Sequence, residues 1–397
     1  MATTSSESST PTLIRYLCFQ RYPPRCVNLK SSHTFQVGFT ITNDLRDEVF
    51  LPLDDDELTI HVGLVAEDEK DIERVGSMPW LGPQSAYKMM SIDCACLLEA
   101  KRGKKRRRGA PAAFRVVAWV DDHDHVCDVD ELTKPAGGFL GLISAPIDIF
   151  NREQDAREAA RAMQSIRRLR IEENIFAEIA EEGGFELDKH IWDASIHLSS
   201  FLARLLRSPG SSPWQSRFAK DPPLDVLELG SGTGLVSIFF ASLLLSSLDV
   251  AQQKSARLVA TDLDSAQPLL VQNISANKHL YPRIHIESAP CDWTEPFAPL
   301  HRPDLVLVSD CTYNPSYFAD LCRTIASALR APPPRDVGDA ARDSFCLLAK
   351  KHRHADEEAL WEHLRDALLT YELVAGSATD DWGIWLVKPT EEASGSC

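Results

Sequence analysis

The segment Asp225-Val-Leu-Glu-Leu-Gly-Ser-Gly-Thr-Gly-Leu235 decides how we interpret the C-terminal half of the chain. An apolar strand enters this segment, three glycines turn the backbone, and an apolar helix leaves it. Glycine suits such a turn because the chain can bend tightly and a ligand can approach without a Cβ atom in the way. The segment therefore predicts a strand, a turn that can bind a ligand, and a helix.

Two carboxylates near this turn bear on the chemistry of the ligand. The spacing Gly230-x-Gly232-x-Gly234 differs from the Gly-x-Gly-x-x-Gly of dinucleotide binders. Glu228 would repel a pyrophosphate but suits the cationic amino group of a methionine moiety. Asp262 ends the next predicted strand, where it can accept both hydroxyls of a ribose. The alternative is a glycine-rich turn in an α/β domain that binds nothing.

The region from 185 to 390 alternates strand and helix patterns, which predicts a doubly wound α/β domain around a mostly parallel sheet. We expect seven strands, and Asp193 as the cap of the first helix. The predicted strands are 225–229, 257–261, 284–287, 304–308, 345–349, 371–374 and 384–387, and the predicted helices are 193–208, 235–245, 265–278, 315–329 and 356–369.

The first 150 residues look rich in β-strands. Apolar residues alternate with polar or small ones around 35–41 and 58–64, and 114–120 is a third strand candidate. The stretch from Arg152 to Glu182 lacks Pro and Gly and is rich in Ala, Glu, Arg and Ile, which predicts an exposed amphipathic helix. The expected organisation is therefore a β-rich domain (1–150), a connecting helix (151–184), the α/β domain (185–390) and a tail (391–397).

The composition limits the classes of protein. A chain of 397 residues suggests two domains, and 44% hydrophobic and 25% charged residues are typical of a globular protein. The sequence contains no run of about 18 apolar residues, so we expect no membrane span. The net charge of −16 argues against broad binding of nucleic acid and suits a cationic partner such as a lysine-rich protein. Ten scattered cysteines indicate a reducing compartment, so we expect a cytoplasmic or nuclear protein. We also expect the protein to be a monomer.

One segment departs from the acidic average. Lys101–Arg108 holds seven of the 42 basic residues in eight positions, which predicts an exposed loop because like charges repel. One interpretation of this run is a solvated insertion. The other is a functional segment, either a nuclear localisation signal or a contact with an anionic partner, and both interpretations stay open.

Several motifs over residues 183–389 together resemble the seven-β-strand protein lysine methyltransferases, also called family 16 or the Asp-x-x-Tyr group. They occur in the order that this family has. The motifs are Ile191-Trp192-Asp193-Ala194, Glu228-Leu-Gly-Ser-Gly-Thr-Gly234, Thr261-Asp262, Asp292-Trp293 and Asp310-Cys-Thr-Tyr313.

This resemblance implies a Rossmann-like methyltransferase that uses S-adenosyl-L-methionine. Trp192, Asp292 and Trp293 would line the cofactor pocket around the nucleoside, and Ser309 takes a place where the family usually has a small residue. The implied function is transfer of a methyl group to a lysine ε-amine of a protein. The alternatives are a small-molecule or nucleic-acid N-methyltransferase and a non-catalytic, methyltransferase-like binding module. The N-terminal domain, the basic insertion and the long gap between the glycine turn and Asp262 depart from the family and leave the substrate open.

Asp310 and Tyr313 follow the fourth predicted strand, where open α/β sheets bind ligands. A lysine must be neutral to attack a methyl group, and neutralising it at pH 7.4 costs about 4 kcal/mol. A carboxylate alone stabilises the ammonium and makes this harder. We therefore hypothesise that Asp310 recruits and orients the amine, while Tyr313 walls the channel. The alternative is that Asp310 caps the next helix, since Asn314-Pro315 follows.

Two other clusters carry chemistry-bearing side chains. His123-Asp-His125-Val-Cys127 and Cys94-x-Cys96 could bind a metal, but their acidic neighbours and irregular spacing favour a solvated loop, so we expect no metal. Lys350-Lys-His-Arg-His354 follows a late strand and could contact the substrate, although a charged strand end is the default interpretation.

Overall fold

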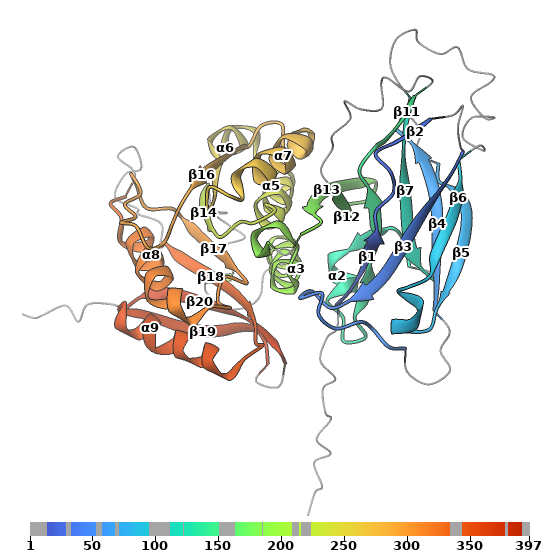
Figure 1. Cartoon of the computed structure of the whole chain (residues 1–397). Helices are drawn as coiled ribbons and strands as arrows, with labels where there is room; N and C mark the ends of the chain where they lie inside the picture. Colours follow the sequence, from blue (N-terminus) through green and yellow to red (C-terminus); the bar gives the residue numbers. More distant parts are fainter. Residues whose placement is uncertain are drawn as a thin grey trace, which may run out of the picture. The chain divides into compact units, whose positions relative to one another are not determined.

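The protein is described here in a computed structural model, which forms two compact units (Figure 1). The N-terminal unit spans Leu13–Phe185, and the C-terminal unit begins at Glu186. The described residues are 14–28, 33–52, 58–67, 71–94, 112–121, 123–150, 163–184, 186–208, 214–215, 224–333, 344–377 and 380–390. The basic run 101–108 and the tail 391–397 lie outside them.

The N-terminal unit is built from two sheets whose apolar side chains share one core. One sheet has the order β6-β3-β1-β9, and the other has the order β13-β12-β10-β7-β11-β2 with β4, β5 and β8 attached. The bounds are β1 (Ile14–Arg21), β2 (Cys26–Asn28), β3 (Thr34–Thr42), β4 (Leu58–Ala66), β5 (Glu73–Trp80), η1 (Pro83–Ser85), β6 (Met89–Asp93), β7 (Ala112–Val120), β8 (Val126–Asp128), α2 (Val129–Leu132), β9 (Gly138–Leu140), β10 (Leu142–Ser144), β11 (Ile147–Phe150), β12 (Gln164–Glu172) and β13 (Ile175–Glu182).

The β-rich character expected for this region is confirmed. The alternation around 35–41 forms β3, in which Val37, Phe39 and Ile41 are buried. The other two predicted strands form β4 and β7, which pair antiparallel with each other. The buried side chains of β3 in one sheet and of β4 and β7 in the other belong to the same core. Hydrophobic burial between the two sheets therefore stabilises the unit.

The helix predicted for Arg152–Glu182 is wrong over the part that the structure describes. Residues 164–182 form the antiparallel hairpin β12–β13, and β12 also pairs with β10 and β8 of the same sheet. Asn174, with φ 64°, turns the chain between the two strands. Asparagine tolerates this left-handed conformation, which a helix interior excludes. Residues 152–162 lie outside the described residues.

The C-terminal unit contains the expected seven-stranded sheet, in the order β16-β15-β14-β17-β18-β20-β19. Strand β20 is antiparallel to both of its neighbours, β18 and β19, and the other described pairings of this sheet are parallel. The bounds are η4 (Leu187–Lys189), α3 (Asp193–Arg207), β14 (Asp225–Leu229), α5 (Leu235–Ser247), α6 (Val250–Ser255), β15 (Arg257–Asp262), α7 (Gln267–Asn277), η5 (Lys278–Leu280), β16 (His285–Pro290), β17 (Leu305–Ser309), η6 (Pro315–Tyr317), α8 (Phe318–Arg330), β18 (Phe345–Lys351), η7 (Ala355–Ala359), α9 (Leu360–Asp366), β19 (Leu369–Gly376) and β20 (Trp382–Pro389).

Helices cover both faces of this sheet, as in a doubly wound fold (Figure 1). Helices α3 and α5 pack on each other and on one face, while α8 and α9 pack on the other face. The central strand β17 is buried along Leu305–Val308, which is why it reads as a continuous apolar run. Helix α5 has apolar residues on all its sides, which fits its position in the interior, where Leu235–Leu244 are buried. The last predicted helix, 356–369, is shorter, since α9 ends at Asp366 and β19 begins at Leu369.

The order of the strands fixes where a ligand can bind. The chain proceeds outward from β14 to β15 and β16 on one side and then to β17 and β18 on the other. The connections therefore diverge between β14 and β17, and the crevice outside the carboxyl ends of such strands is the usual ligand site. The long gap between the glycine turn and Asp262 is occupied by α5 and α6.

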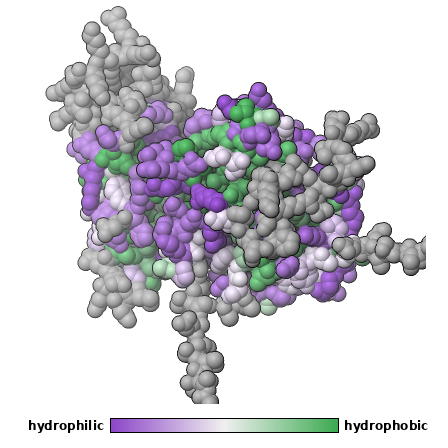
Figure 2. Space-filling model, turned by 180° about the vertical axis from the view of Figure 1, so that it is seen from behind, coloured by the Kyte–Doolittle hydropathy of each residue, from purple (hydrophilic) through white to green (hydrophobic). Residues whose placement is uncertain are grey.

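Among the described residues, no helix is long and apolar enough to cross a membrane, and no group of His, Cys, Asp and Glu side chains could hold a metal ion. The described cysteines have free thiols, and most are buried. On the face seen in Figure 2, hydrophilic and hydrophobic residues are interspersed. This mixture is ordinary for a globular protein surface.

A buried ion pair joins the two strands of the β12–β13 hairpin. Arg167 Nε donates to Glu181 Oε2 at 2.6 Å, and both side chains are fully buried. Arg46 Nη2 donates to the other oxygen of Glu181 at 3.1 Å. Arg167 Nη1 also donates to the carbonyl oxygen of Leu17 at 2.6 Å. The pair therefore connects the hairpin to β1 as well as closing it.

We expect Glu181→Ala to lower the free energy of unfolding of the N-terminal unit by about 3–5 kcal/mol, because it leaves the buried Arg167 without its counter-charge. The exposed pair Lys134–Glu131 provides the control, and Glu131→Ala should cost less than about 1 kcal/mol. Urea denaturation of the whole chain measures both variants. Equal losses for the two variants would contradict this account of the buried pair.

Candidate active site

A cavity of about 460 Å³ lies outside the carboxyl ends of β14, β15 and β17, within the size range of ligand pockets. All the predicted site residues except Glu228 and Gly234 line it. These lining residues are Trp192, Gly230, Gly232, Asp262, Asp292, Trp293, Ser309, Asp310 and Tyr313. The chain order thus brings residues more than 100 positions apart to one cleft at the edge of the sheet.

The glycine loop requires glycine at each of its three positions. Gly230, Gly232 and Gly234 have φ values of 70°, 51° and 78°, a left-handed conformation that other residues rarely adopt. A Cβ atom at Gly230 would lie 2.3 Å from Cys311 Sγ, and one at Gly234 would lie 2.6 Å from Leu270 Cδ1. The loop is therefore both strained for other residues and closely packed.

Hydrogen bonds join this loop to the end of β15. Asp262 Oδ2 accepts from Gly232 N at 2.7 Å, and its Oδ1 accepts from Leu263 N at 2.7 Å. Burial raises the pKa of Asp262, Asp188 adds to the rise, and the two backbone donors oppose it. The carboxylate thus lies on the cleft wall in a fixed orientation, as a ribose-binding group requires.

Glu228 lies beneath the loop and does not line the cleft. It is 1% exposed, and its Oε2 accepts from Ser237 N at 3.2 Å and from Ser237 Oγ. Burial raises the pKa of Glu228 to about 7, opposed by these hydrogen bonds. Direct contact with the amino group of a methionine, the role that we expected, does not fit this enclosed position. Glu228 instead anchors the first turn of α5 under the glycine loop.

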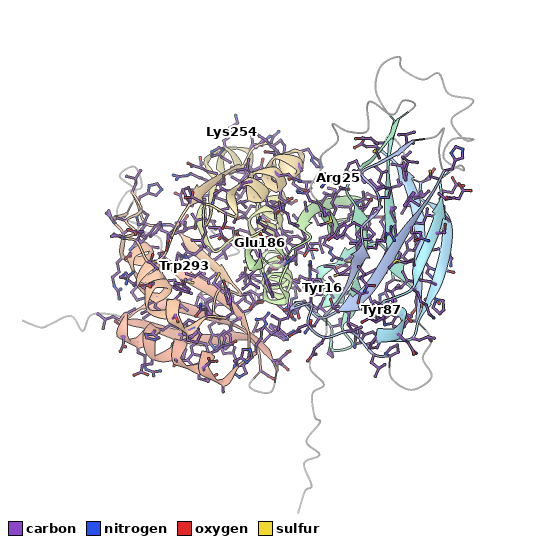
Figure 3. All side chains as sticks on the ribbon, viewed as in Figure 1. Tyr16, Arg25, Tyr87, Glu186, Lys254 and Trp293 are labelled. Carbon is purple, nitrogen blue, oxygen red and sulfur yellow. The ribbon has the colours of Figure 1, made fainter. Side chains whose placement is uncertain are left out.

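The two tryptophans of the cleft come from two different loops. Trp293, labelled in Figure 3, belongs to the segment after β16 and packs near Gly230 and against the hydrophobic core. Asp292 beside it is exposed, and its hydrogen bonds from the side chain and backbone of Thr294 lower its pKa. Trp192 immediately precedes α3, and its Nε1 donates to the carbonyl of Leu187 at 2.9 Å.

Asp310 lies directly after β17 with φ 56°, a conformation that aspartate tolerates better than most residues. Its backbone N donates to Ala349 O at 2.9 Å. Its two carboxylate oxygens accept from Nη1 and Nη2 of Arg353 at 2.6 and 2.7 Å. The alternative that Asp310 caps the next helix is wrong, because Asn314 caps η6 through its own side chain.

Tyr313 and Tyr317 stand at the rim of the cleft, each about half exposed. Partial burial raises the pKa of Tyr313, and the neighbouring Cys311, Asp262 and Asp188 add to the rise. The Tyr313 hydroxyl therefore remains protonated at neutral pH and can donate a hydrogen bond. A wall made by two phenol rings is also suited to a cationic group.

Sequence reasoning missed three residues of the site. Arg353 was only one member of the charged run 350–354, whose default interpretation was a charged strand end. Asp188 lines the cleft, and its Oδ2 accepts from Ser265 Oγ at 2.9 Å. Cys311 is buried against the glycine loop, where burial raises the pKa of its thiol well above the ordinary value. No local pattern marked them, although the position of Arg353 just after β18, next to the strand that carries Asp310, was a usable signal.

The rest of the charged run serves internal ion pairs. Lys350 is 3.2 Å from Glu357, and Lys351 is 2.6 Å from Asp193. Asp193 is the first residue of α3 and follows the N-cap residue Trp192, so its predicted position as the cap is wrong. Through Lys351 and Arg353, the end of β18 is thus connected to α3 and to the end of β17.

The charges on the wall of the cleft are mostly negative. The carboxyl groups of Asp188, Asp262, Asp292 and Asp310 line it, and none of its described lining residues is Lys or Arg. A pyrophosphate would meet repulsion here, whereas a ligand with a positive charge would be attracted. The geometry therefore favours a cationic nucleoside ligand over a dinucleotide.

Comparison with protein families agrees with this geometry. Residues 171–366 match the family model described as lysine methyltransferase. Over these residues the chain is similar to the lysine methyltransferase family. We therefore call the C-terminal unit the methyltransferase unit. The match begins near the end of β12, so it also includes β13 of the N-terminal unit.

Two curated yeast proteins are similar to the chain. A UPF0665 family protein of Schizosaccharomyces pombe is 27% identical over 195 residues, 48% of this chain and 51% of its own length. The protein-lysine N-methyltransferase EFM6 of Saccharomyces cerevisiae is 30% identical over 143 residues, 33% of this chain and 52% of its own length. The chain thus spans about half the length of the curated relatives that it matches.

Solved methyltransferases resemble the chain only distantly. The mitomycin 7-O-methyltransferase MmcR has a TM-score of 0.32 and 13% identity, over 50% of this chain and 57% of its own. Human N-acetylserotonin methyltransferase in complex with SAM has a TM-score of 0.31 and 11% identity, over 50% and 56%. Similarity this low says nothing about the substrate.

The buried carboxyl of Glu228 makes the stability of the methyltransferase unit depend on pH. Its pKa is about 7 in the folded chain and ordinarily 4.5, so the folded state binds the proton more tightly. The resulting stabilisation is fully present below pH 4.5 and is lost as pH rises through 7. Glu228→Gln should therefore gain roughly 2–3 kcal/mol relative to the unmodified chain between pH 5 and pH 8.

Urea denaturation at several pH values measures this difference. Glu287→Gln, at an exposed carboxyl on β16, is the control and should follow the unmodified chain. If the stability of Glu228→Gln stays parallel to that of the unmodified chain from pH 5 to pH 8, Glu228 does not hold a proton in the folded state.

Proposed function

We propose that the methyltransferase unit transfers a methyl group from S-adenosyl-L-methionine to the ε-amine of a lysine in a protein substrate. The observation that carries this proposal is the anionic cleft, which the glycine loop, Asp262, Asp310 and Tyr313 line together. A methyl donor with a sulfonium and an ammonium group matches this charge. The lysine methyltransferase family match supports the choice of acceptor.

The residues of the cleft fit such a donor. Asp262 would accept hydrogen bonds from the ribose hydroxyls, as acidic residues at this strand end do in related sheets. At Gly232 the backbone of the glycine loop is open to the cleft. Among the described residues, a Cβ atom there would have only the Asp188 carbonyl within 4 Å, at 3.2 Å from its oxygen. Trp293, with Leu187 and Leu263, supplies apolar walls for a nucleoside base.

The bound donor would supply a methyl group on a sulfonium, so that a nitrogen–carbon bond forms while the carbon–sulfur bond breaks and its electron pair stays on sulfur. The amine must lose one proton, before attack or from the product, and water accepts it. Asp310 and Tyr313 would orient the amine in line, by hydrogen bonds from fixed positions. The aromatic rim of Tyr313 and Tyr317 would also admit the cationic lysine chain.

A protein acceptor fits the charge of the whole chain. With a net charge of −16, long-range attraction favours basic proteins over nucleic acid. The similar EFM6 is itself described as a protein-lysine N-methyltransferase. A small-molecule acceptor and a non-catalytic binding module are the competing functions, and the experiments below separate them. A cytoplasmic or nuclear location and a monomeric state belong to the same proposal.

Gly230→Ala should abolish donor binding, because its Cβ would overlap Cys311 Sγ and its φ is unfavourable for alanine. Isothermal titration calorimetry with S-adenosyl-L-methionine measures this loss, which we expect to exceed about 100-fold in Kd. Such a loss corresponds to roughly 2.8 kcal/mol. Gly137→Ala is the matched control, since Gly137 also has a positive φ of 65° but belongs to the N-terminal unit. Equal affinities of the two variants would place the donor elsewhere.

Asp310→Asn should keep donor binding but reduce methyl transfer by at least about 100-fold, because the amine loses its orienting carboxylate. Asparagine removes the negative charge, as alanine would, but it keeps the shape of the side chain and one oxygen that can accept a hydrogen bond from Arg353. Transfer is measured as labelled methyl groups incorporated into a cell lysate, followed by digestion with protease or nuclease.

The digestion identifies the acceptor class. Label released by protease and recovered as methyl-lysine supports the proposal. Label found only in nucleic acid or small molecules excludes the lysine function, and donor binding without any transfer indicates a binding module. Unchanged transfer by Asp310→Asn would remove Asp310 from the reaction.

A further inference from the structure

The carboxylate expected to meet the substrate amine is already bound on both oxygens. Arg353 Nη1 and Nη2 contact Asp310 Oδ1 and Oδ2 at 2.6 and 2.7 Å, the parallel two-bond geometry of the strongest ion pairs. The Asp310 and Arg353 side chains are 3% and 8% exposed. Water therefore screens the pair little, and the two charges largely cancel at the cleft wall.

Arg353 is held in place from several sides. Its guanidinium carbon lies 5.5 Å from the centre of the Trp192 ring, and Trp192 also lines the cleft. Its Nη1 is 3.4 Å from the carbonyl of Lys351, and its backbone N is 3.4 Å from Glu357 Oε2. Arg353 itself is not among the lining residues. It thus acts on the cleft through Asp310 and Trp192.

The sign of this charge matters for methyl transfer to an amine. Only the neutral amine has a lone pair for attack, and a nearby uncompensated carboxylate stabilises the ammonium form by about 1–3 pKa units. A guanidinium behind the carboxylate opposes this effect, because it remains charged at every accessible pH. A carboxylate paired in this way can still accept a hydrogen bond from the amine and orient it.

We propose that Arg353 is a positioning residue that compensates the charge of Asp310, so that the cleft accepts the substrate amine in its neutral, reactive form. The proposal rests on the lysine methyltransferase function proposed above and concerns the same site. Arg353 fixes the direction of the Asp310 carboxylate and prevents it from trapping an ammonium ion. The Asp310–Arg353 pair would thereby bind and orient the amine without stabilising its unreactive ammonium form.

Other charged or titratable groups near the pair are already engaged. Lys351 pairs with Asp193 and Asp381, and Lys350 pairs with Glu357. The titratable groups that line the site are Asp188, His190, Asp262, Cys291, Asp292, Cys311, Tyr313 and Tyr317. Glu228 lies beneath the glycine loop, and His352 lies on the segment of Arg353 itself. Because the remaining carboxylates on the cleft wall are negative, loss of Arg353 would leave an excess of negative charge beside the amine.

The test is the pH dependence of methyl transfer by Arg353→Gln and Arg353→Lys in the full-length chain. The acceptor is the protein of a cell lysate, and the readout is the initial rate of protease-sensitive label at saturating S-adenosyl-L-methionine, from pH 6.5 to 10. For Arg353→Gln, the pH of half-maximal rate should rise by at least about one unit. Its rate at pH 7.5 should fall about tenfold, with the deficit shrinking toward pH 10.

The second variant and a control separate charge from packing. Arg353→Lys keeps the positive charge, so its pH profile should stay within a few tenths of a unit of the unmodified chain, even if its rate falls. Arg257→Gln removes an arginine from the partly exposed ion pair with Glu287 and should change neither rate nor profile. Donor binding and thermal unfolding are measured at each pH to confirm that every variant is folded.

Five results would overturn the proposal. An equal loss of rate at all pH values in Arg353→Gln would indicate a purely structural role. A faster rate at pH 7.5 would indicate that Arg353 blocks the amine, and a shift of the same size in Arg353→Lys would exclude a charge effect. If the unmodified chain labels no protein at all, the lysine function fails and this inference falls with it. If it labels protein but the profiles coincide, only the role of Arg353 is excluded.

Discussion

The hydrogen bond from Gly232 N to Asp262 Oδ2 is the contact on which the cleft depends. It joins the turn after β14 to the end of β15, and Ser231 N reinforces it by donating to Thr261 O at 2.9 Å. The turn can come this close only because its three glycines carry no Cβ atom. Since α5 starts directly from this turn, the same contact sets both the cleft wall and the helix beneath it. Substitution in the loop should therefore disturb binding before it disturbs the rest of the sheet.

The second constraint is electrostatic. Several carboxyl groups converge where the strands end, and their mutual repulsion must be met in a poorly hydrated space. Two solutions occur side by side: burial raises the pKa of Glu228 toward neutrality, whereas Asp310 receives a guanidinium on both oxygens. Asp262 remains on the cleft wall, bound by backbone donors alone. The proposed function, which would require a cationic donor and a neutral amine in one cleft, would need this uneven distribution of charge.

The C-terminal fold was predictable because its signals are local. A buried strand, a glycine turn and an apolar helix follow one another in sequence, and the strand order then brings the predicted residues to one edge. Two features were not predictable in this way. Arg353 meets Asp310 across 43 positions, so no pattern within one element indicates the pair. The β12–β13 hairpin resembled a helix by composition. Its apolar residues nevertheless follow the period of a strand, since Leu169 and Ile171 flank Arg170, and Ala177 and Ile179 flank Glu178.

The same hairpin shows why family similarity and structural units need not share a boundary. The family match begins at residue 171, near the end of β12, whereas β12 pairs with β13 and also with β10 and β8 of the N-terminal unit. A cut at the start of the match would separate Arg167 from Glu181 and leave a buried charge without its partner. The cost of exposing or isolating such a charge is several kcal/mol. The physical boundary of the methyltransferase unit therefore lies after β13, near Glu186, and not where the sequence similarity starts.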